Sequence, residues 1–286
     1  QDSKFYGSYN GNLKVRDVVA NTKSTVNSSI DCGYPIGQLY QHPLPQFGDR
    51  FFALQGANQK LYFTNSANHS TGYDLLENTN FPGVHSIKNF NIPKSDPNVM
   101  YTTTNAFGFW NDAKLLKFRL NEFTLSPDAN CATEMTCNNP NGCFTELKYL
   151  DDACRNFFLS TAVAVSSSNK DKIWVAIDWQ LRYLTASQYP VSCGSTHYKI
   201  RKTVNGGVNP SDWVADDAGL PDYGITSLVY VDGSNDAMFC ATANGRIFYK
   251  NAGLSSWQEV DVNLPHTAIS KLEINYCTKR LYVATF

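Results

Sequence analysis

Residues 213–228 read WVADDAGLPDYGITSL, and residues 257–272 read WQEVDVNLPHTAISKL. Trp, Leu-Pro, Ile and Leu recur in the same order 44 residues apart. The segments before the two copies also match, because residues 198–202 running into Asn205-Gly206 correspond to residues 247–250 running into Asn251-Ala252-Gly253. A repeat of this length, built from short strands and turns, predicts one supersecondary unit copied around an axis or along a solenoid.

A short aromatic-aliphatic strand after a polar turn is the most regular element of the chain. It recurs at residues 61–64, 100–103, 173–176, 238–241 and 281–284. Gly, Asn, Asp, Ser and Pro fill the turns, since they tolerate the dihedrals of tight turns. Before the turns lie apolar strands at residues 51–54, 84–92, 162–165, 225–231 and 269–274. Such continuous apolar runs are typical of strands covered on both faces.

Each unit therefore reads as one four-stranded antiparallel blade. Several blades arranged radially make a β-propeller, so we expect an all-β fold and a single domain over residues 1–286. A helical fold is excluded because no long segment shows the three-to-four spacing of an amphipathic helix. A β-sandwich would not need the 44-residue recurrence.

The number of blades depends on the long gaps between the recurring strands. Five blades result if insertions at about residues 126–156 and 179–196 fill these gaps, and seven result if each gap holds a further blade. The chain stops at Phe286 just after a second strand, so the last blade lacks two strands. We expect residues 4–8 and 12–16 to supply them, with residues 1–17 hydrogen-bonded beside the C-terminal strand. N- and C-terminal strands in one blade would then close the ring and remove an exposed sheet edge.

The repeats resemble a known propeller motif. Asn205, Gly206 and Trp213 resemble the Asp-box repeat of sialidase-like, xyloglucanase-type and sortilin-type propellers, and Asn251, Gly253 and Trp257 do so again. Asparagine replaces the usual aspartate in both copies, and the spacing from glycine to tryptophan is longer. The resemblance implies a propeller in which the Trp fills the gap beneath a hairpin and the polar residue caps the turn. Sialidase activity is not expected, because the chain has no arginine cluster to hold a substrate carboxylate.

Composition excludes two classes of partner. Charged residues make up 17% of the chain and the net charge is −1, so no basic field exists to bind a nucleic acid. No run of about 18 apolar residues occurs, so membrane insertion is not expected.

Cysteine usage indicates the compartment. The chain has eight cysteines and no C-x-x-C spacing, which predicts disulfides and an oxidising environment. They are Cys32, Cys131, Cys137, Cys143, Cys154, Cys193, Cys240 and Cys277. The chain begins at Gln1 without methionine, as a signal-cleaved protein would, and Asn27 and Asn68 fit the N-glycosylation pattern. We therefore expect a secreted glycoprotein.

The most site-like stretch follows the strand at residues 173–177. Asp178, Trp179, Arg182 and Tyr183 offer a carboxylate, an indole, a guanidinium and a phenol, which together could hold a sugar. In the alternative interpretation, Trp179 and Tyr183 pack under the insertion and Asp178 caps a turn. Trp110 and Asp112 occupy the equivalent place in the previous unit, so both loops would open on one face.

No catalytic or metal set is recognisable. The turn at residues 232–236 has oxygens suited to calcium, but it lacks the bidentate glutamate of a hand-type loop and matches plain turns elsewhere. The five histidines show no pairing at short spacing, so no cofactor or metal is predicted.

The sequence thus predicts a secreted, non-catalytic recognition protein that binds a glycan or an extracellular protein through its loops. One alternative is a glycoside hydrolase or lyase with loop carboxylates such as Asp178 and Asp112. Another is a structural module of an extracellular assembly. Fold alone does not separate these functions.

Overall fold

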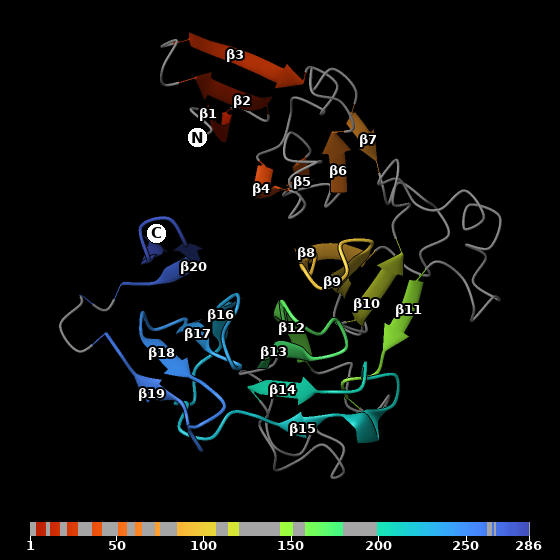
Figure 1. The fold of residues 1–286 in the computed structure, drawn as a ribbon, viewed down its shortest axis with the longest axis vertical. Coiled ribbons are helices and arrows are strands. Elements are labelled where there is room, and N and C mark those ends of the chain that lie inside the picture. The colour runs from red at the N-terminus through yellow and green to blue at the C-terminus, as the bar shows by residue number, and fades with distance from the viewer. Residues whose placement is uncertain are drawn as a thin grey trace. The chain divides into compact units, whose positions relative to one another are not determined.

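A computed structural model describes residues 85–106, 114–119, 144–150, 158–179, 199–261, 265 and 267–285, together with strands between residues 4 and 74. Side chains are described within 89–103, 114–117, 145–150, 161–177, 199–261, 265 and 267–285. The chain divides into two compact units, Gln1–Ile87 with Arg119–Cys143, and Lys88–Phe118 with Phe144–Phe286. Figure 1 labels the strands of both units.

The first unit contains two sheets. One has three strands in the order β1 (Lys4–Tyr9), β2 (Asn12–Asp17) and β3 (Thr22–Asn27). The other has four strands in the order β4 (Ile36–Gln41), β5 (Phe51–Gln55), β6 (Leu61–Thr64) and β7 (Gly72–Asp74).

Three four-stranded sheets and a two-stranded sheet follow. The first of them contains β8 (His85–Asn91), β9 (Val99–Ala106), β10 (Lys114–Arg119) and β11 (Phe144–Leu147). The next contains β12 (Phe158–Val165), β13 (Ile173–Trp179), β14 (Ile200–Thr203) and β15 (Val214–Ala215). Then come β16 (Ile225–Tyr230), β17 (Met238–Thr242), β18 (Ile247–Lys250) and β19 (Gln258–Glu259), and finally β20 (Ile269–Asn275) with β21 (Arg280–Thr285). Neighbours in each sheet are consecutive in the chain (Figure 1).

The predicted all-β fold with four-stranded antiparallel sheets is confirmed. β9, β13, β17 and β21 are second strands, as predicted. β5 and β6 are the second and third strands of their sheet, because β4 precedes them, whereas the sequence predicted a first and a second strand. Two insertion boundaries also differ, since β11 lies inside residues 126–156 and β13 extends to Trp179. The single domain, the five blades and the closed ring concern both units together and stay predictions.

A bulge explains why isoleucine and leucine recur three residues apart. In a regular strand, residues at this spacing lie on opposite faces of the sheet. The register of β16 with β17 skips Thr226, and Ile225 and Leu228 consequently enter the same core. The register of β20 with β21 skips Ser270 in the same way, which brings Ile269 and Leu272 together. The motif therefore marks a bulged first strand.

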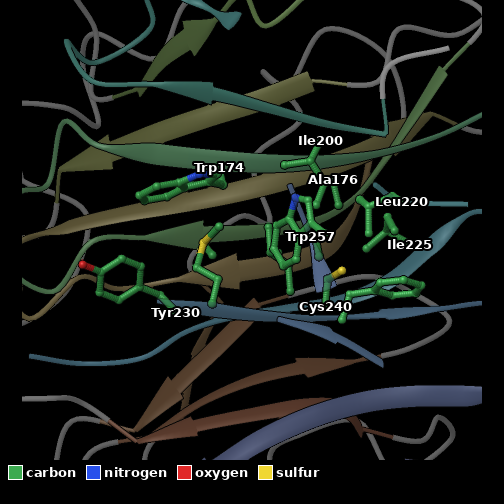
Figure 2. Packing of buried hydrophobic residues seen from close by; sticks show 13 residues of the cluster. Trp174, Ala176, Ile200, Leu220, Ile225, Tyr230, Cys240 and Trp257 are labelled. Carbon is green, nitrogen blue, oxygen red and sulfur yellow. The ribbon is translucent and has the colours of Figure 1, made fainter. Parts of the chain in front are cut away.

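The second strands are covered on both faces. In β13, Ile173, Val175 and Ile177 pack into one core with residues of β9 and β10. Trp174 and Ala176 of the same strand face the opposite core, formed with β16 and β17 (Figure 2). All five residues are at most 2% exposed, and burial of each large aliphatic side chain contributes roughly 1.5–3 kcal/mol. The β12–β15 sheet is thus held to the sheets before and after it by apolar cores.

Candidate functional site

The predicted ligand residues lie largely beyond the described part of the chain. Asp178 and Trp179 end β13 and pair with Leu159 and Phe158 of β12. They are therefore strand residues rather than loop residues, and successive strand positions belong to opposite faces of a sheet. The four other predicted ligand residues lie outside the described residues; they are Arg182, Tyr183, Trp110 and Asp112.

The two predicted ligand loops begin at equivalent places. One follows β9 and the other follows β13, which are the second strands of neighbouring sheets. The base of the second loop is pinned: Ile177 N–H donates to the Lys199 carbonyl at 2.8 Å, and Lys199 N–H donates to Asp217 Oδ2 at 2.8 Å. Loops with fixed ends can present side chains in a defined geometry.

The turns between first and second strands meet at the opposite end of these sheets; we call residues 92–98, 166–172, 231–237 and 276–279 the hairpin rim. The Ser95 hydroxyl donates to the Ser166 carbonyl at 3.2 Å. Gly233 N–H donates to Ser167 Oγ at 3.1 Å. Lys172 Nζ donates to the Asp236 carboxylate at 2.7 and 2.8 Å. Neighbouring turns are thereby tied to one another.

Lys94 connects three turns of the hairpin rim. Its ammonium lies 2.5 Å from Asp232 Oδ2 and 5.1 Å from the centre of the Tyr276 ring. Tyr276 OH accepts a hydrogen bond from Asp232 N–H at 3.0 Å and donates to the Tyr230 carbonyl at 3.3 Å. Asp232 and Asp236 of the turn with calcium-type oxygens are therefore both ion-paired with lysines.

Other carboxylates join the sheets. Asp216 accepts a hydrogen bond from Trp174 Nε1–H at 2.8 Å and pairs with Lys250 while only 14% of its side chain is exposed. Asp171 lies 2.7 Å from Lys170 Nζ and 3.3 Å from Lys117 Nζ. Burial acts to raise the pKa of Asp171, but the hydrogen bond from Lys170 and the charge of Lys117 outweigh it and lower that pKa. Within the described ranges, no three His, Cys, Asp or Glu side chains gather as a metal site would require.

The structure corrects the disulfide prediction at two positions. Cys240 and Cys277 are both free thiols. Cys240 is fully buried among apolar side chains such as Ile225 and Trp257 (Figure 2), and the described residues of that core include no second cysteine. Burial raises the pKa of the Cys240 thiol, so this group is inert. The other six cysteines and Asn68 lie outside the described residues, and of Asn27 only the backbone, at the end of β3, is described; the cysteines are Cys32, Cys131, Cys137, Cys143, Cys154 and Cys193.

Both repeated tryptophans are buried, and Trp213 lies beneath its own hairpin as expected. Trp213 and Trp257 are 3% and 2% exposed, and each lies in the core shared with the preceding sheet. Trp213 Nε1–H donates to the Gly207 carbonyl at 2.9 Å, and Trp257 Nε1–H donates to the Asp216 carbonyl at 2.6 Å. Asn251 Oδ1 caps its turn by accepting Gly253 N–H at 2.9 Å.

Sequence reasoning missed an exposed apolar surface on the hairpin between β14 and β15. Val204, Val208 and Val214 are 58%, 52% and 60% exposed. The signal was present in the repeat, because the strand registers align exposed Val214 with the polar Gln258.

No protein-family model matches the chain, and no curated protein matches it significantly. Several solved structures have a similar fold. The extracellular domain of BT4673 from B. thetaiotaomicron superposes with a TM-score of 0.57 at 14% identity, over 99% of this chain and 30% of that chain. The Cps50 (Swd1) β-propeller domain from Myceliophteria thermophila gives 0.52 at 9% identity, over 99% and 80%. The Dos1 propeller gives 0.53 at 8%, over 98% and 62%.

These likenesses, together with the four-stranded antiparallel sheets, show a β-propeller fold. The chain spans less than a third of the length of the BT4673 chain. Identities this low carry the fold and not the function. The part of the chain that the structure describes contains no helix with the length and hydropathy of a membrane-spanning segment.

Proposed function

We propose that the protein is an extracellular, non-catalytic recognition module that binds a glycan or another extracellular protein through the loops after β9 and β13. The observation that carries the proposal is the placement of these loops. The loop after β9 bears Trp110 and Asp112, and the loop after β13 bears Arg182 and Tyr183, shortly after Asp178 and Trp179 at the end of that strand. Both loops leave the second strands of neighbouring sheets at the end opposite the hairpin rim.

The rest of the described structure supports a scaffold role for the sheets. The described aspartates Asp171, Asp216 and Asp236 form ion pairs with lysines, and Asp217 caps the start of a strand. Carboxylates held in this way stabilise the fold and are poorly placed to exchange protons with a substrate.

Further properties belong to the same proposal. The protein is secreted, Asn27 and Asn68 accept glycans, and the six cysteines outside the described residues form disulfides. The last two repeats are degenerate Asp-boxes, as supported by the buried Trp213 and Trp257. One similar structure, the extracellular domain of BT4673, supports the extracellular location.

A glycan array tests the proposal. Wild type, Trp179→Ala and the control Tyr282→Ala should be compared, since Tyr282 is 51% exposed on a different sheet. We expect a specific glycan signal that Trp179→Ala weakens about ten-fold or more and that the control retains. If both variants keep the wild-type signal, Trp179 takes no part in binding. The absence of any signal from the wild type would contradict glycan binding.

Catalysis is tested on the same ligands. Release of reducing sugar by the wild type, abolished by Asp178→Asn, would contradict the non-catalytic assignment and favour the hydrolase.

A further inference from the structure

The link between β15 and β16 exposes an aromatic side chain at the end of the sheets opposite the hairpin rim. Tyr223 of this link is 44% exposed, and the side chain of the neighbouring Asp222 is 88% exposed. Lys199 Nζ lies 3.9 Å from Asp222 Oδ1, and Lys199 directly precedes β14, where the loop after β13 ends. We call Lys199, Asp222 and Tyr223 the link surface. The link surface therefore borders one of the loops of the proposed function.

The link itself is fixed in place by the sheet that follows it. The Ala218 carbonyl accepts a hydrogen bond from Trp257 N–H at 2.8 Å, and the Gly224 carbonyl accepts one from Ala243 N–H at 2.8 Å. Between these two points, Leu220 packs into the buried core shown in Figure 2. A surface presented by such a rigid segment binds without the cost of ordering itself.

The following repeat shows that the fold does not need an aromatic residue at this position. Thr267 stands where the link has Tyr223, two residues after the proline of Leu-Pro. Tyr223 N–H donates to the Pro221 carbonyl at 2.9 Å. In the same way, Thr267 N–H donates to the Pro265 carbonyl at 2.8 Å. Because threonine supports the same turn, the exposed ring of Tyr223 is not a structural requirement of the repeat.

The chemistry of the link surface matches a neutral sugar ring. A tyrosine ring offers a flat apolar face on which the C–H face of a pyranose can stack. The Asp222 carboxylate accepts hydrogen bonds and the Lys199 ammonium donates them, and a sugar hydroxyl can take part in both. Asp217 Oδ2 also lies against the backbone N–H of Lys199, so two described carboxylates share the surroundings of one ammonium. This excess of negative charge disfavours an anionic sugar.

We propose, on the basis of the proposed function, that the link surface is a subsite for a neutral pyranose of the bound glycan. The ring of Tyr223 stacks on the sugar, and Asp222 and Lys199 form hydrogen bonds with its hydroxyl groups. The subsite extends the ligand face from the loop after β13 toward the following sheet, and it gives the protein a preference for neutral over acidic glycans.

A glycan array tests the stacking residue when it carries neutral oligosaccharides beside counterparts in which single hexoses are oxidised to hexuronic acids. We expect the wild type to prefer the neutral members. Tyr223→Thr introduces the residue of the following repeat, so it should fold, and it should weaken binding about ten-fold. Tyr223→Phe keeps the ring and should stay within about two-fold of the wild type. The control Tyr282→Thr makes the same change at a 51% exposed tyrosine elsewhere and should keep the wild-type signal.

Asp222→Asn tests the preference for neutral sugars on the same array. The variant loses a charged acceptor, so neutral glycans should bind about two- to five-fold more weakly. Acidic counterparts should bind more tightly than they bind the wild type, because a repulsive carboxylate is removed. Equal weakening of neutral and acidic glycans would assign Asp222 a merely structural role and would contradict the charge preference.

The variants separate failure of the subsite from failure of the proposed function. A signal that Trp179→Ala loses and Tyr223→Thr keeps would overturn the subsite and leave the proposed function intact. A signal that Tyr223→Thr loses, with its melting temperature preserved, and Trp179→Ala keeps would support the subsite and contradict the role of Trp179. A wild type that prefers the acidic counterparts would overturn the assignment to a neutral sugar. A wild type that binds no glycan would overturn the subsite and leave a protein as the partner of the ligand face.

Discussion

Gly207 illustrates a residue whose type is dictated by both conformation and space. Its φ is +65° and a Cβ would lie 2.4 Å from Cζ2 of Trp213. We expect Gly207→Ala to lower the free energy of unfolding by about 2–4 kcal/mol. The added methyl group would have to displace the buried Trp213 indole, and alanine is also strained at a positive φ. Urea denaturation measures the loss.

Gly233 provides the matched control, with φ +72° and nothing within 4 Å of a Cβ. Gly233→Ala should cost only about 1 kcal/mol, the strain of the left-handed backbone alone. Equal losses in the two variants would show that contact with Trp213 is unimportant.

Residue roles that depend on neighbours in sequence were predictable, whereas contacts between residues far apart in sequence were not. Trp213 and Asn251 have the expected roles because a turn and its cap depend on neighbours in sequence, whereas Trp257 bonds the distant Asp216 carbonyl. The free thiol of Cys240 was not predicted, since the identity of its core neighbours depends on which strands pack together. Asp178 and Trp179 were expected at the start of a loop, but β13 continues through them because its pairing with β12 extends that far.

The two-stranded sheet β20–β21 differs from the other sheets in the face directed away from its core. Lys271 and Glu273 occupy the places that Ser227 and Val229 hold in β16, as the two registers show. Burial lowers the pKa of Lys271, and the charge of Glu273 opposes this only in part. The element thus carries a partly buried amine in place of a small side chain.

We expect Lys271→Ser to stabilise the protein by about 1 kcal/mol at pH 7. The pKa of Lys271 is lower in the folded than in the unfolded chain, so the penalty of burying its charge is complete below the folded pKa. This penalty disappears as the pH rises from the pKa of Lys271 in the folded chain toward its pKa in the unfolded chain. The free energy of unfolding of the wild type increases by the same amount. Denaturation at pH 7 and pH 10 should show the variant's advantage shrinking with pH. A constant advantage, or one shared by the exposed control Arg280→Ser, would contradict this explanation.

Elements were predictable where turns are short. The strands β9, β13, β17 and β21 follow compact polar turns whose composition marks them. β11 was not predicted because a long polar stretch separates it in sequence from the preceding strand. β4 was not predicted because no recognisable repeat motif precedes it. The recurrence of Ile and Leu was visible in the sequence, but the bulge that explains it was not predicted. Residues three apart lie on opposite faces of a regular strand, so the spacing alone did not indicate a shared core.

At the scale of the whole molecule, the exposed edge of β21 bears on how the chain completes its fold. β17 is buried at Met238 and from Cys240 to Thr242, whereas every residue of β21 except Leu281 is exposed. We predict that residues 1–17 pair with β21 and complete its sheet. Deleting them should therefore accelerate amide hydrogen exchange in β21 about ten-fold or more, without affecting β17. Unchanged exchange in β21 would contradict ring closure.

The extra residue in the first strands occurs at one place in four sheets, at Gly37, Thr161, Thr226 and Ser270. Without Thr226, Ile225 and Leu228 would stand two positions apart and would still enter one core. The residue therefore contributes local bend and twist rather than burial. A deletion of one residue at any of these positions would therefore leave the same side chains buried. We expect alignment gaps in related chains to occur preferentially at these four positions.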